Sequence, residues 1–309
     1  MKKLKVVFYR QDKPYTNGIE HNFFQYAIWE ALPRLLGEAT RIDLDNVTFI
    51  DIDNKNGFYF DPLPGEWDIA YSDKCVPTRK PAKFYFSFQS DWRGNQERTT
   101  RWFKLAKPDV LFNMYSPARS LKDACANNNV RYEYTPWWIV NPQPKLVDTS
   151  RPIRAMSTGA MGTHYVWRTA FARALKQMNR LDIISMSKKN NVSYEKYLSR
   201  LAQTKYYCTG PTDDDDPKQS SIPHKYIEVC NYGCCLVAPD SPYMEAAGFI
   251  PNVNYIQCHD PNEISKIVMD DKRWIDIGAA GQEMIQRLHT VEKRAERILE
   301  VYKEMTNAD

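Results

Sequence analysis

The chain has 309 residues, of which 43% are hydrophobic and 26% are charged, and its formal net charge is +4. This length suits two medium domains better than one, and the composition excludes disorder over most of the chain. No stretch approaches the roughly 18 uninterrupted apolar residues of a membrane span, and the lysine-bearing start is too short and too β-like for a signal peptide. We therefore expect a cytoplasmic protein, or one in the host cytoplasm if the chain is viral.

The first half alternates β-rich runs with helical or irregular segments. Expected strands are Lys5–Tyr9, Val47–Ile52, Asp68–Tyr71, Phe84–Phe88, Asp109–Asn113 and Arg131–Tyr134. A first helix carries Phe24, Ile28, Ala31 and Leu35 at helical spacing and should be kinked or shortened by Pro33, and further helices are expected over Gln96–Ala106 and Pro117–Ala126. Such alternation predicts a mostly parallel sheet that helices cover on both faces.

A proline-bearing segment, Pro136 to Pro152, interrupts this pattern and is interpreted as an interdomain linker. The alternation then restarts, with expected strands Ile153–Ser157, Asp182–Met186, Tyr206–Cys208, Cys234–Ala238 and Asn254–Ile256 and expected helices Tyr165–Gln177, Ser193–Gln203, His224–Asn231 and Pro261–Asp270. A last helix places Met284, Leu288, Val291, Ala295, Ile298, Tyr302 and Met305 on one stripe. We expect an α/β fold of two Rossmann-like domains, residues 1–145 and 146–309, with the last helix packing back on the first domain.

A glycine-bearing turn of the second half is suited to an anionic ligand. In open α/β sheets, ligands bind where strand ends lead into helix N-termini. The turn from Gly159 to Gly162 lies between a strand and the helix that holds Arg168. Its glycines allow close backbone approach, the helix N-terminus supplies free N–H groups for a phosphate, and Arg168 can add a bidentate clamp. Such turns are also common without a ligand.

A second loop, from Ser220 to Glu228, ends a polar segment and opens a helix. Ser220 and Ser221 are hydroxyl donors near the helix start, and Lys225 is a cation for a diphosphate. Glu228 lies on the next turn, where its carboxylate could take two ribose hydroxyls. His224 lies in the same loop and is a candidate polar contact to phosphate or sugar. The structural alternative is an N-cap serine followed by surface charges.

A series of features follows in order along the second half: the Gly159–Arg168 turn, Tyr194 to Leu198, Ser220 to Asp240, Glu245 to Phe249, Asn254 to Ile256, Gly278 to Gly281, His289-Thr290 and Arg294. In these features the second half resembles the donor half of GT-B glycosyltransferases, especially the short subgroup of spore-maturation-type and bacteriophage-encoded transferases. The resemblance covers roughly residues 153–299 and is only architectural over the first half. It implies two Rossmann-like domains that face a central cleft, and a hexosyl- or pentosyltransferase activity.

The resemblance also implies roles for individual residues. Glu228 would bind the ribose, and Arg168 and Lys225 would hold the diphosphate. Assistance would come from Ser220, Ser221, His224 and the backbone from Gly159 to Gly162. Many retaining members carry a second glutamate where this chain has Ser220, so the anomeric outcome stays open. The co-substrate is a nucleotide sugar, with UDP as the default nucleotide.

No cofactor and no metal are expected. GT-B enzymes generally work without a bound metal and use basic residues and helix dipoles against the leaving diphosphate. The four adjacent carboxylates from Asp213 to Asp216 are therefore interpreted as a solvated acidic loop rather than as a divalent cation site. The seven cysteines are odd in number and form no Cys-x-x-Cys pair, which indicates neither a zinc site nor a disulfide framework.

Candidates for a catalytic base lie beyond strand ends of the first half. An inverting transferase needs a carboxylate or imidazole within about 3 Å of the acceptor hydroxyl, whereas a retaining one can dispense with it. The candidates are Asp91, Glu20, His21 and Asp73. Asp91 is preferred, because its loop also carries Trp92 as an aromatic platform and Arg93 as a cation.

The segment Arg79–Lys107 contains eight Lys or Arg residues against two acids and suits an anionic acceptor. Arg98, Arg101 and Lys104 could share a helix face near Arg93 and bind the phosphates of double-stranded DNA. Some bacteriophage relatives of this architecture glycosylate hydroxymethylated bases, which requires base flipping. The alternative acceptor is a glycan, a protein hydroxyl or a small molecule, with Trp92, Trp137 and Trp138 stacking on sugar.

Two alternatives belong to other functional classes. A non-catalytic nucleotide-sugar-binding protein on the same fold predicts binding without turnover. A nucleic-acid-binding module that uses only the Arg79–Lys107 segment predicts steeply salt-dependent binding that survives the loss of Glu228 and Arg168.

Overall fold

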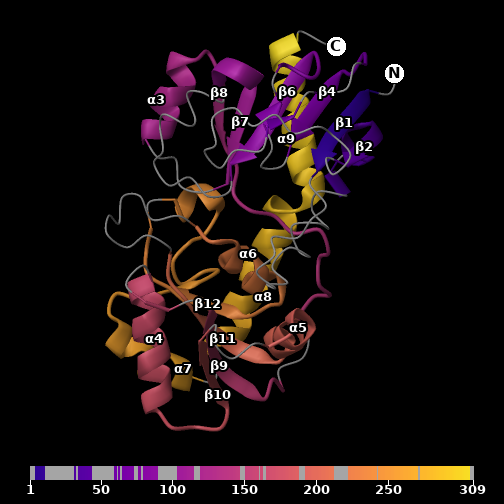
Figure 1. The fold of residues 1–309 in the computed structure, drawn as a ribbon. Coiled ribbons are helices and arrows are strands. Elements are labelled where there is room, and N and C mark those ends of the chain that lie inside the picture. The colour runs from indigo at the N-terminus through magenta and orange to yellow at the C-terminus, as the bar shows by residue number, and fades with distance from the viewer. Residues whose placement is uncertain are drawn as a thin grey trace. The chain divides into compact units, whose positions relative to one another are not determined.

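A computed structural model describes residues 4–10, 31–32, 34–43, 59–60, 62, 65–72, 76–77, 79–89, 103–114, 119–146, 150–159, 161–162, 165–187, 192–211, 222–241, 243–270 and 272–306. The chain divides into two compact units (Figure 1). Unit 1 comprises Met1–Thr135 and Val291–Asp309, and unit 2 comprises Pro136–Thr290. The division lies ahead of the expected boundary after residue 145, and the C-terminal residues belong to unit 1.

Unit 1 contains a six-stranded sheet in the order β2-β1-β4-β6-β7-β8, and every neighbouring pair is parallel. Its strands are β1 (Lys5–Arg10), β2 (Glu38–Asp43), β4 (Ile69–Ser72), β6 (Phe84–Gln89), β7 (Val110–Asn113) and β8 (Arg131–Tyr134). Two further strands, β3 (Tyr59–Phe60) and β5 (Val76–Pro77), form a separate two-stranded sheet. The side chains of β7 are buried on both faces, as the apolar run Val-Leu-Phe predicts for a parallel strand. Helix α3 (Arg119–Asn127) packs against β8.

Unit 2 contains a five-stranded parallel sheet in the order β10-β9-β11-β12-β13. Its strands are β9 (Ile153–Gly159), β10 (Ile183–Ser187), β11 (Thr204–Cys208), β12 (Cys235–Ala238) and β13 (Ile256–Gln257). Its helices are α4 (Val166–Gln177), α5 (Tyr194–Ala202), α6 (His224–Asn231), α7 (Ile264–Met269) and α8 (Arg273–Leu288), with short 3-10 turns η3 (Glu245–Ala247) and η4 (Pro261–Glu263). Helices α4 and α7 pack together against β9, and α6 and α8 pack together against β12 (Figure 1). The expected helix over Pro261–Asp270 is therefore a 3-10 turn that continues into α7.

The last helix of the sequence is two helices, which corrects the expectation of a single one. Helix α8 ends at Leu288, and α9 (Val291–Thr306) begins after His289 and Thr290. The backbone N–H of Ile139 donates to the carbonyl of His289 at 2.8 Å, and the His289 ring bonds the carbonyl of Ala247 at 2.8 Å. These contacts within unit 2 hold the His289 backbone out of the helical conformation (ψ 43°). The apolar stripe of the sequence therefore extends across a break between two helices.

The described part of the segment expected as a linker is packed within unit 2. Ile139 forms an isolated bridge with Thr290. The backbone N–H groups of Gln143 and Leu146 donate to the side chains of Asn231 and Gln282 at 3.1 and 2.8 Å. Buried backbone groups need such partners when no regular structure supplies them.

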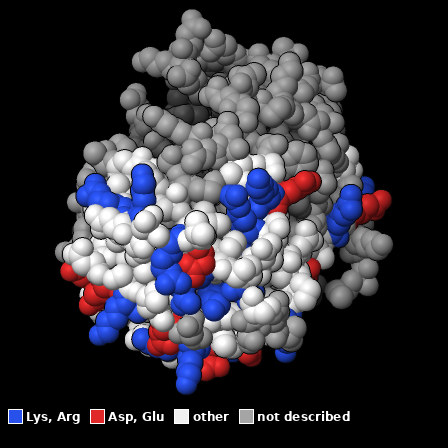
Figure 2. Space-filling view, turned by 90° about the horizontal axis from the view of Figure 1, so that it is seen from below, with Lys and Arg blue, Asp and Glu red and all other residues white. Residues whose placement is uncertain are grey.

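One face of the molecule carries charges of both signs. Figure 2 shows Lys and Arg side chains interspersed with Asp and Glu on the described part of that face. In unit 2 the carboxylate of Asp182 pairs with Arg154 at 3.1 Å and with Arg180 at 2.9 Å. Among the described residues, no helix has both the length and the apolar content to cross a membrane.

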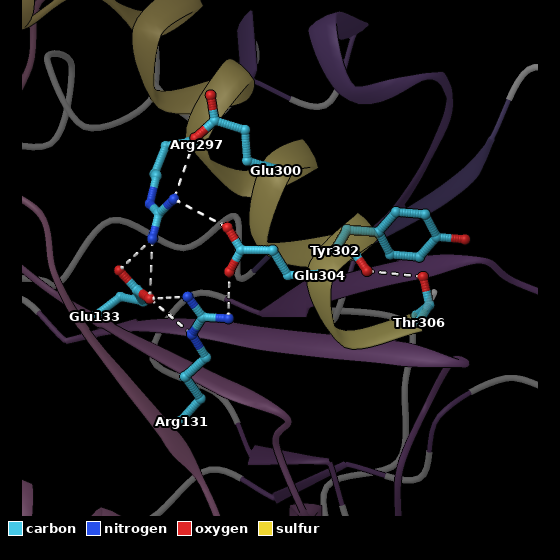
Figure 3. Close-up of polar contacts among 7 residues, drawn as sticks. All are labelled: Arg131, Glu133, Arg297, Glu300, Tyr302, Glu304 and Thr306. Atoms are coloured by element: carbon cyan, nitrogen blue, oxygen red, sulfur yellow. Dashed lines mark hydrogen bonds and ion pairs between the residues drawn. The ribbon is translucent and has the colours of Figure 1, made fainter. Parts of the chain in front are cut away.

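Helix α9 is fastened to β8 of unit 1 by a network of ion pairs (Figure 3). Arg297 donates to both carboxylate oxygens of Glu133 at 3.1 Å, and Arg131 pairs with Glu133 and with Glu304 at 2.6 Å. Tyr302 adds a ring contact with Phe84 of β6, with centroids 5.4 Å apart. The C-terminal residues therefore contribute to the packing of the first sheet.

Candidate functional site

The strand order of unit 2 creates a topological switch point between β9 and β11. After β9 the chain forms β10 on one side of it, and then returns to form β11 on the other side. In open α/β sheets, the loops that follow two such strands leave a crevice in which ligands bind. Here these loops begin at Gly159 and at Thr209.

Arg168 connects the two sides of this switch point. It lies in the first turn of α4 and is buried, with 6% of its surface exposed. Its Nε donates to the Thr209 hydroxyl at 3.3 Å, and its guanidinium carbon lies 4.5 Å from the ring centroid of Tyr165. A guanidinium held in this way presents its planar edge in a fixed direction, which suits recognition of a phosphate.

The turn after β9 brings its backbone close to Arg168. Gly159 has φ +123°, which disfavours any residue with a side chain, and a Cβ there would lie 3.1 Å from Nη1 of Arg168. Gly162 has φ +140°, and a Cβ there would meet nothing within 4 Å. The Gly162 N–H donates to the Thr169 hydroxyl at 3.0 Å. Gly162 thus ties the turn to α4 by a hydrogen bond and has open space where a side chain would stand.

Helix α6 also begins with basic side chains. His224 and Lys225 occupy its first turn, which contains no acidic residue, and the preceding Pro223 makes no side-chain capping bond. A cation at a helix N-terminus is disfavoured by the helix dipole. The Lys225 ammonium is stabilised instead by aromatic faces, 4.9 Å from the centroid of Tyr197 and 5.8 Å from that of Tyr207. The first turn of α4 likewise lacks an acid, so both helix starts favour an anion.

Glu228 lies one turn further along α6 and is buried, with 5% of its surface exposed. Tyr194 donates to its Oε1 at 3.0 Å, and Tyr197 donates to its Oε2 at 2.8 Å. Burial, followed by the charge of Glu228, raises the pKa of both tyrosines well above the usual range. The two hydroxyls therefore stay protonated and donate. Each carboxylate oxygen has a second lone pair, which leaves acceptor capacity for a ligand.

Residues 153–300 match the family model described as "Glycosyl transferase-like". The chain has the GT-B fold, and its second half is similar in sequence to glycosyltransferases. The match begins with β9 and covers the turn at Gly159, Arg168, Lys225 and Glu228. None of the curated proteins compared with the chain matches it in sequence.

Solved glycosyltransferases share this fold over the full chain. HepE of Anabaena, solved with UDP and glucose, has a TM-score of 0.59 at 10% identity and covers 97% of this chain and 100% of its own. The DNA-modifying enzyme β-glucosyltransferase has a TM-score of 0.55 at 8% identity, with 97% and 100% covered. A glycosyltransferase from Rickettsia africae has a TM-score of 0.55 at 9% identity, with 100% of both chains covered. At these identities the likeness concerns the fold.

The structure brings part of the predicted donor site together. Arg168 lies beside Gly159 and bonds Thr209 at the switch point, and Lys225 is linked to Glu228 through Tyr197. The remaining donor candidates, Ser220 and Ser221, lie outside the described residues. So do the catalytic and acceptor candidates Asp91, Glu20, His21, Asp73, Trp92, Arg93, Arg98 and Arg101 and the acidic run Asp213 to Asp216. Within the described residues, no group of three His, Cys, Asp or Glu side chains could hold a metal ion.

Two tryptophans proposed as sugar platforms are in the core, which corrects that expectation. Trp138 has none of its surface exposed and Trp137 has 6% exposed. The Trp137 ring packs edge-on against the His224 ring, with centroids 5.3 Å apart. A buried ring face cannot stack on a sugar. Trp137 instead packs against His224 at the start of α6.

Sequence reasoning missed the tyrosines of the site. Tyr194 and Tyr197 were noted only as part of a family likeness, although they stand three residues apart on an expected helix and therefore share one face. That spacing is the feature of the sequence that indicates a shared role for the two tyrosines. Their partner, Glu228, lies more than thirty residues away in the chain, and only the packing of the unit reveals it.

Proposed function

We propose that this protein is a glycosyltransferase that takes its sugar from a UDP-sugar, and that the UDP-sugar binds at the switch point of unit 2. The observation that carries the proposal is the link between two basic, acid-free helix starts, those of α4 and α6. Lys225 of α6 lies beside the ring of Tyr207, whose hydroxyl bonds Thr158 just before the turn that leads to α4. Support for uridine comes from HepE, solved with UDP-glucose, and from β-glucosyltransferase, whose substrate is uridine diphosphoglucose.

Each residue of the site then has a definite role. Arg168 and Lys225 bind the diphosphate, and the backbone of the turn from Gly159 to Gly162 assists them. As the bond to the sugar breaks, negative charge grows on the departing phosphate oxygen, and these fixed positive groups stabilise it. Glu228 accepts hydrogen bonds from the ribose hydroxyls, and His224 contacts phosphate or sugar. Ser220 and Ser221 assist as hydroxyl donors. No step requires a metal.

The donor assignment is tested by a thermal-shift series with UDP-glucose, UDP-N-acetylglucosamine, GDP-mannose and ADP-glucose. A ligand at about 100 times its Kd adds about 2.7 kcal/mol of stability. We expect the uridine compounds to give the largest shift in the wild-type protein, and Glu228→Gln to reduce it. An equal shift in the variant refutes the assignment of Glu228, and a preference for GDP or ADP refutes that of UDP.

For the acceptor, we propose a hydroxymethylated base of modified DNA, as found in bacteriophages. Two observations support it: the likeness of fold to a DNA-modifying β-glucosyltransferase, and the basic residues Arg93, Arg98 and Arg101 of the sequence. Cations placed along a surface bind DNA phosphates and release counterions, so binding falls steeply with salt. A flipped base would bring its hydroxymethyl group to the sugar.

A specific observation favours the alternative acceptor, a glycan, protein or small molecule. Lys80 and Lys83 of the basic segment pair with Asp109 at 2.7 Å and with Asp68 at 2.9 Å. Lysines held by carboxylates contribute less to phosphate binding. Transfer of labelled sugar from UDP-glucose to duplexes with 5-hydroxymethylcytosine or with plain cytosine decides between the two. Label confined to the hydroxymethylated duplex supports DNA, and release of sugar to water with no label on either duplex refutes it.

A further inference from the structure

Tyr197 contacts both charged groups of the proposed donor site. Its hydroxyl donates to Oε2 of Glu228 at 2.8 Å, while its ring face lies 4.9 Å from the ammonium of Lys225. Lys225 and Glu228 are three residues apart on α6, whereas Tyr197 comes from α5. One side chain of a neighbouring helix therefore fixes the direction of a cation and of a carboxylate.

The same contacts continue to the turn after β9. The Tyr207 ring is the second aromatic face beside Lys225, at 5.8 Å, and its hydroxyl shares a 2.8 Å hydrogen bond with Thr158, the residue before Gly159. Tyr194 completes the arrangement by donating to the other oxygen of Glu228 at 3.0 Å. Charged groups held by buried hydrogen bonds and aromatic faces lose little freedom on ligand binding, which strengthens that binding.

We infer that Tyr197 is a positioning residue that sets ribose recognition through Glu228 and diphosphate recognition through Lys225. The inference rests on the proposed function. It assigns the two effects to separate parts of one side chain. The hydroxyl acts on the carboxylate and also interacts with Tyr207, and the ring acts on the cation. Removing the hydroxyl alone leaves the ring beside Lys225 and should therefore affect the recognition of the ribose far more than that of the diphosphate.

Isothermal titration of UDP, 2′-deoxy-UDP and UMP separates the two effects. The ratio of UDP to 2′-deoxy-UDP affinity reports the ribose contact, and the ratio of UDP to UMP affinity reports the second phosphate. We expect Tyr197→Phe to lower the first ratio about tenfold through loss of a hydrogen bond to a charged group, and to leave the second ratio unchanged. Tyr197→Leu should lower both, the second about threefold to tenfold through loss of the cation–π contact.

Tyr206→Phe is the matched control. Tyr206 precedes Tyr207 on β11, so its side chain points to the opposite face of the sheet, where its hydroxyl donates to the carbonyl of Asp270 at 2.6 Å. Tyr206→Phe also removes a hydrogen bond that a tyrosine hydroxyl donates. It should nevertheless leave both affinity ratios at the wild-type value. Thermal unfolding midpoints, recorded for every variant, show any general loss of stability.

The outcomes separate this inference from the proposed function. A wild-type protein that prefers UDP over 2′-deoxy-UDP, together with an unchanged preference in Tyr197→Phe, overturns the inference alone. Equal changes of both ratios in Tyr197→Phe overturn it as well, because they indicate a general disturbance of the site. A wild-type protein without any preference for the ribose refutes the role of Glu228, and the inference with it. If Tyr197→Leu does not fold, the comparison of the two affinity ratios between Tyr197→Phe and Tyr206→Phe still tests the inference.

Discussion

Arg168 on α4 donates to the hydroxyl of Thr209 at 3.3 Å, and this bond joins the helix after β9 to the loop after β11. The side chain is thereby held across the crevice that the strand order creates. Because the bond uses Nε, the geometry of the planar guanidinium matters as well as its charge. A lysine at this position would keep the charge and lose the fixed edge.

Replacing Arg168 by lysine should therefore weaken UDP binding about tenfold, as expected for the loss of a hydrogen bond to a charged group, with uridine affinity unchanged. Isothermal titration with UDP and uridine measures both. Arg173→Lys, further along α4, is the control and should leave both affinities unchanged. If UDP and uridine lose affinity equally in Arg168→Lys, the residue supports the fold of the site and does not contact the diphosphate.

The ion-pair network between α9 and β8 should contribute measurably to stability. Arg297→Ala removes both bonds to Glu133, whose side chain is only 17% exposed, and should destabilise the protein by about 1–2 kcal/mol, more than a surface pair. Urea unfolding measures this. The matched control is Lys293→Ala on the same helix, whose partner Glu296 is 56% exposed, and it should cost no more than about 0.5 kcal/mol. Equal effects of the two substitutions would show that the network acts as ordinary surface charge.

Much of the fold could be predicted because buried parallel strands have recognisable sequences. Strands β6, β7 and β12 are rich in apolar residues, as is typical of parallel strands that are buried on both faces, and they were located to within a residue. Strand β2 was missed. Its sequence, Glu-Ala-Thr-Arg-Ile-Asp, has no apolar run, and it forms by pairing with β1 along its full length. The expected strand Val47–Ile52 lies outside the described residues.

The limits of sequence reasoning were similar at the ends of helices and in the site. The break after Leu288 depends on contacts of His289 with Ile139 and Ala247, which no local pattern records. In the site, Arg168, Lys225 and Glu228 could be proposed because each stands at a helix start or one turn beyond it. The supporting tyrosines could not, since their role follows from the packing of α5 beside α6.

A glycine of α8 should tolerate no side chain. A Cβ on Gly278 would lie 2.6 Å from the carbonyl oxygen of Gly233, so the helix could not keep its present position. Glycine to alanine inside a helix normally stabilises by about 0.5–1 kcal/mol. Here we expect Gly278→Ala to destabilise by about 1–3 kcal/mol through overpacking. Urea unfolding gives the sign. Glu283→Ala on the exposed side of α8 is the control, and a stabilised Gly278→Ala would contradict the close packing.

The stability of unit 2 should depend on the ionisation of Asp182 in acid. Hydrogen bonds from Arg180 first, and also from Arg154, lower the pKa of this carboxyl from 3.8 to about 2, against the opposing effect of burial. A carboxyl with a lowered pKa in the folded state stabilises the protein above its unfolded pKa, and this stabilisation disappears as the pH falls from about 4 to about 2. Asp182→Asn should therefore be less stable than the wild type by about 1 kcal/mol near pH 7, with the difference shrinking below about pH 4. Urea unfolding at several pH values measures the difference. The control, Asp123→Asn on the exposed side of α3, should show no such trend, and a difference for Asp182→Asn that stays constant into acid would refute the ion-pair origin of the effect.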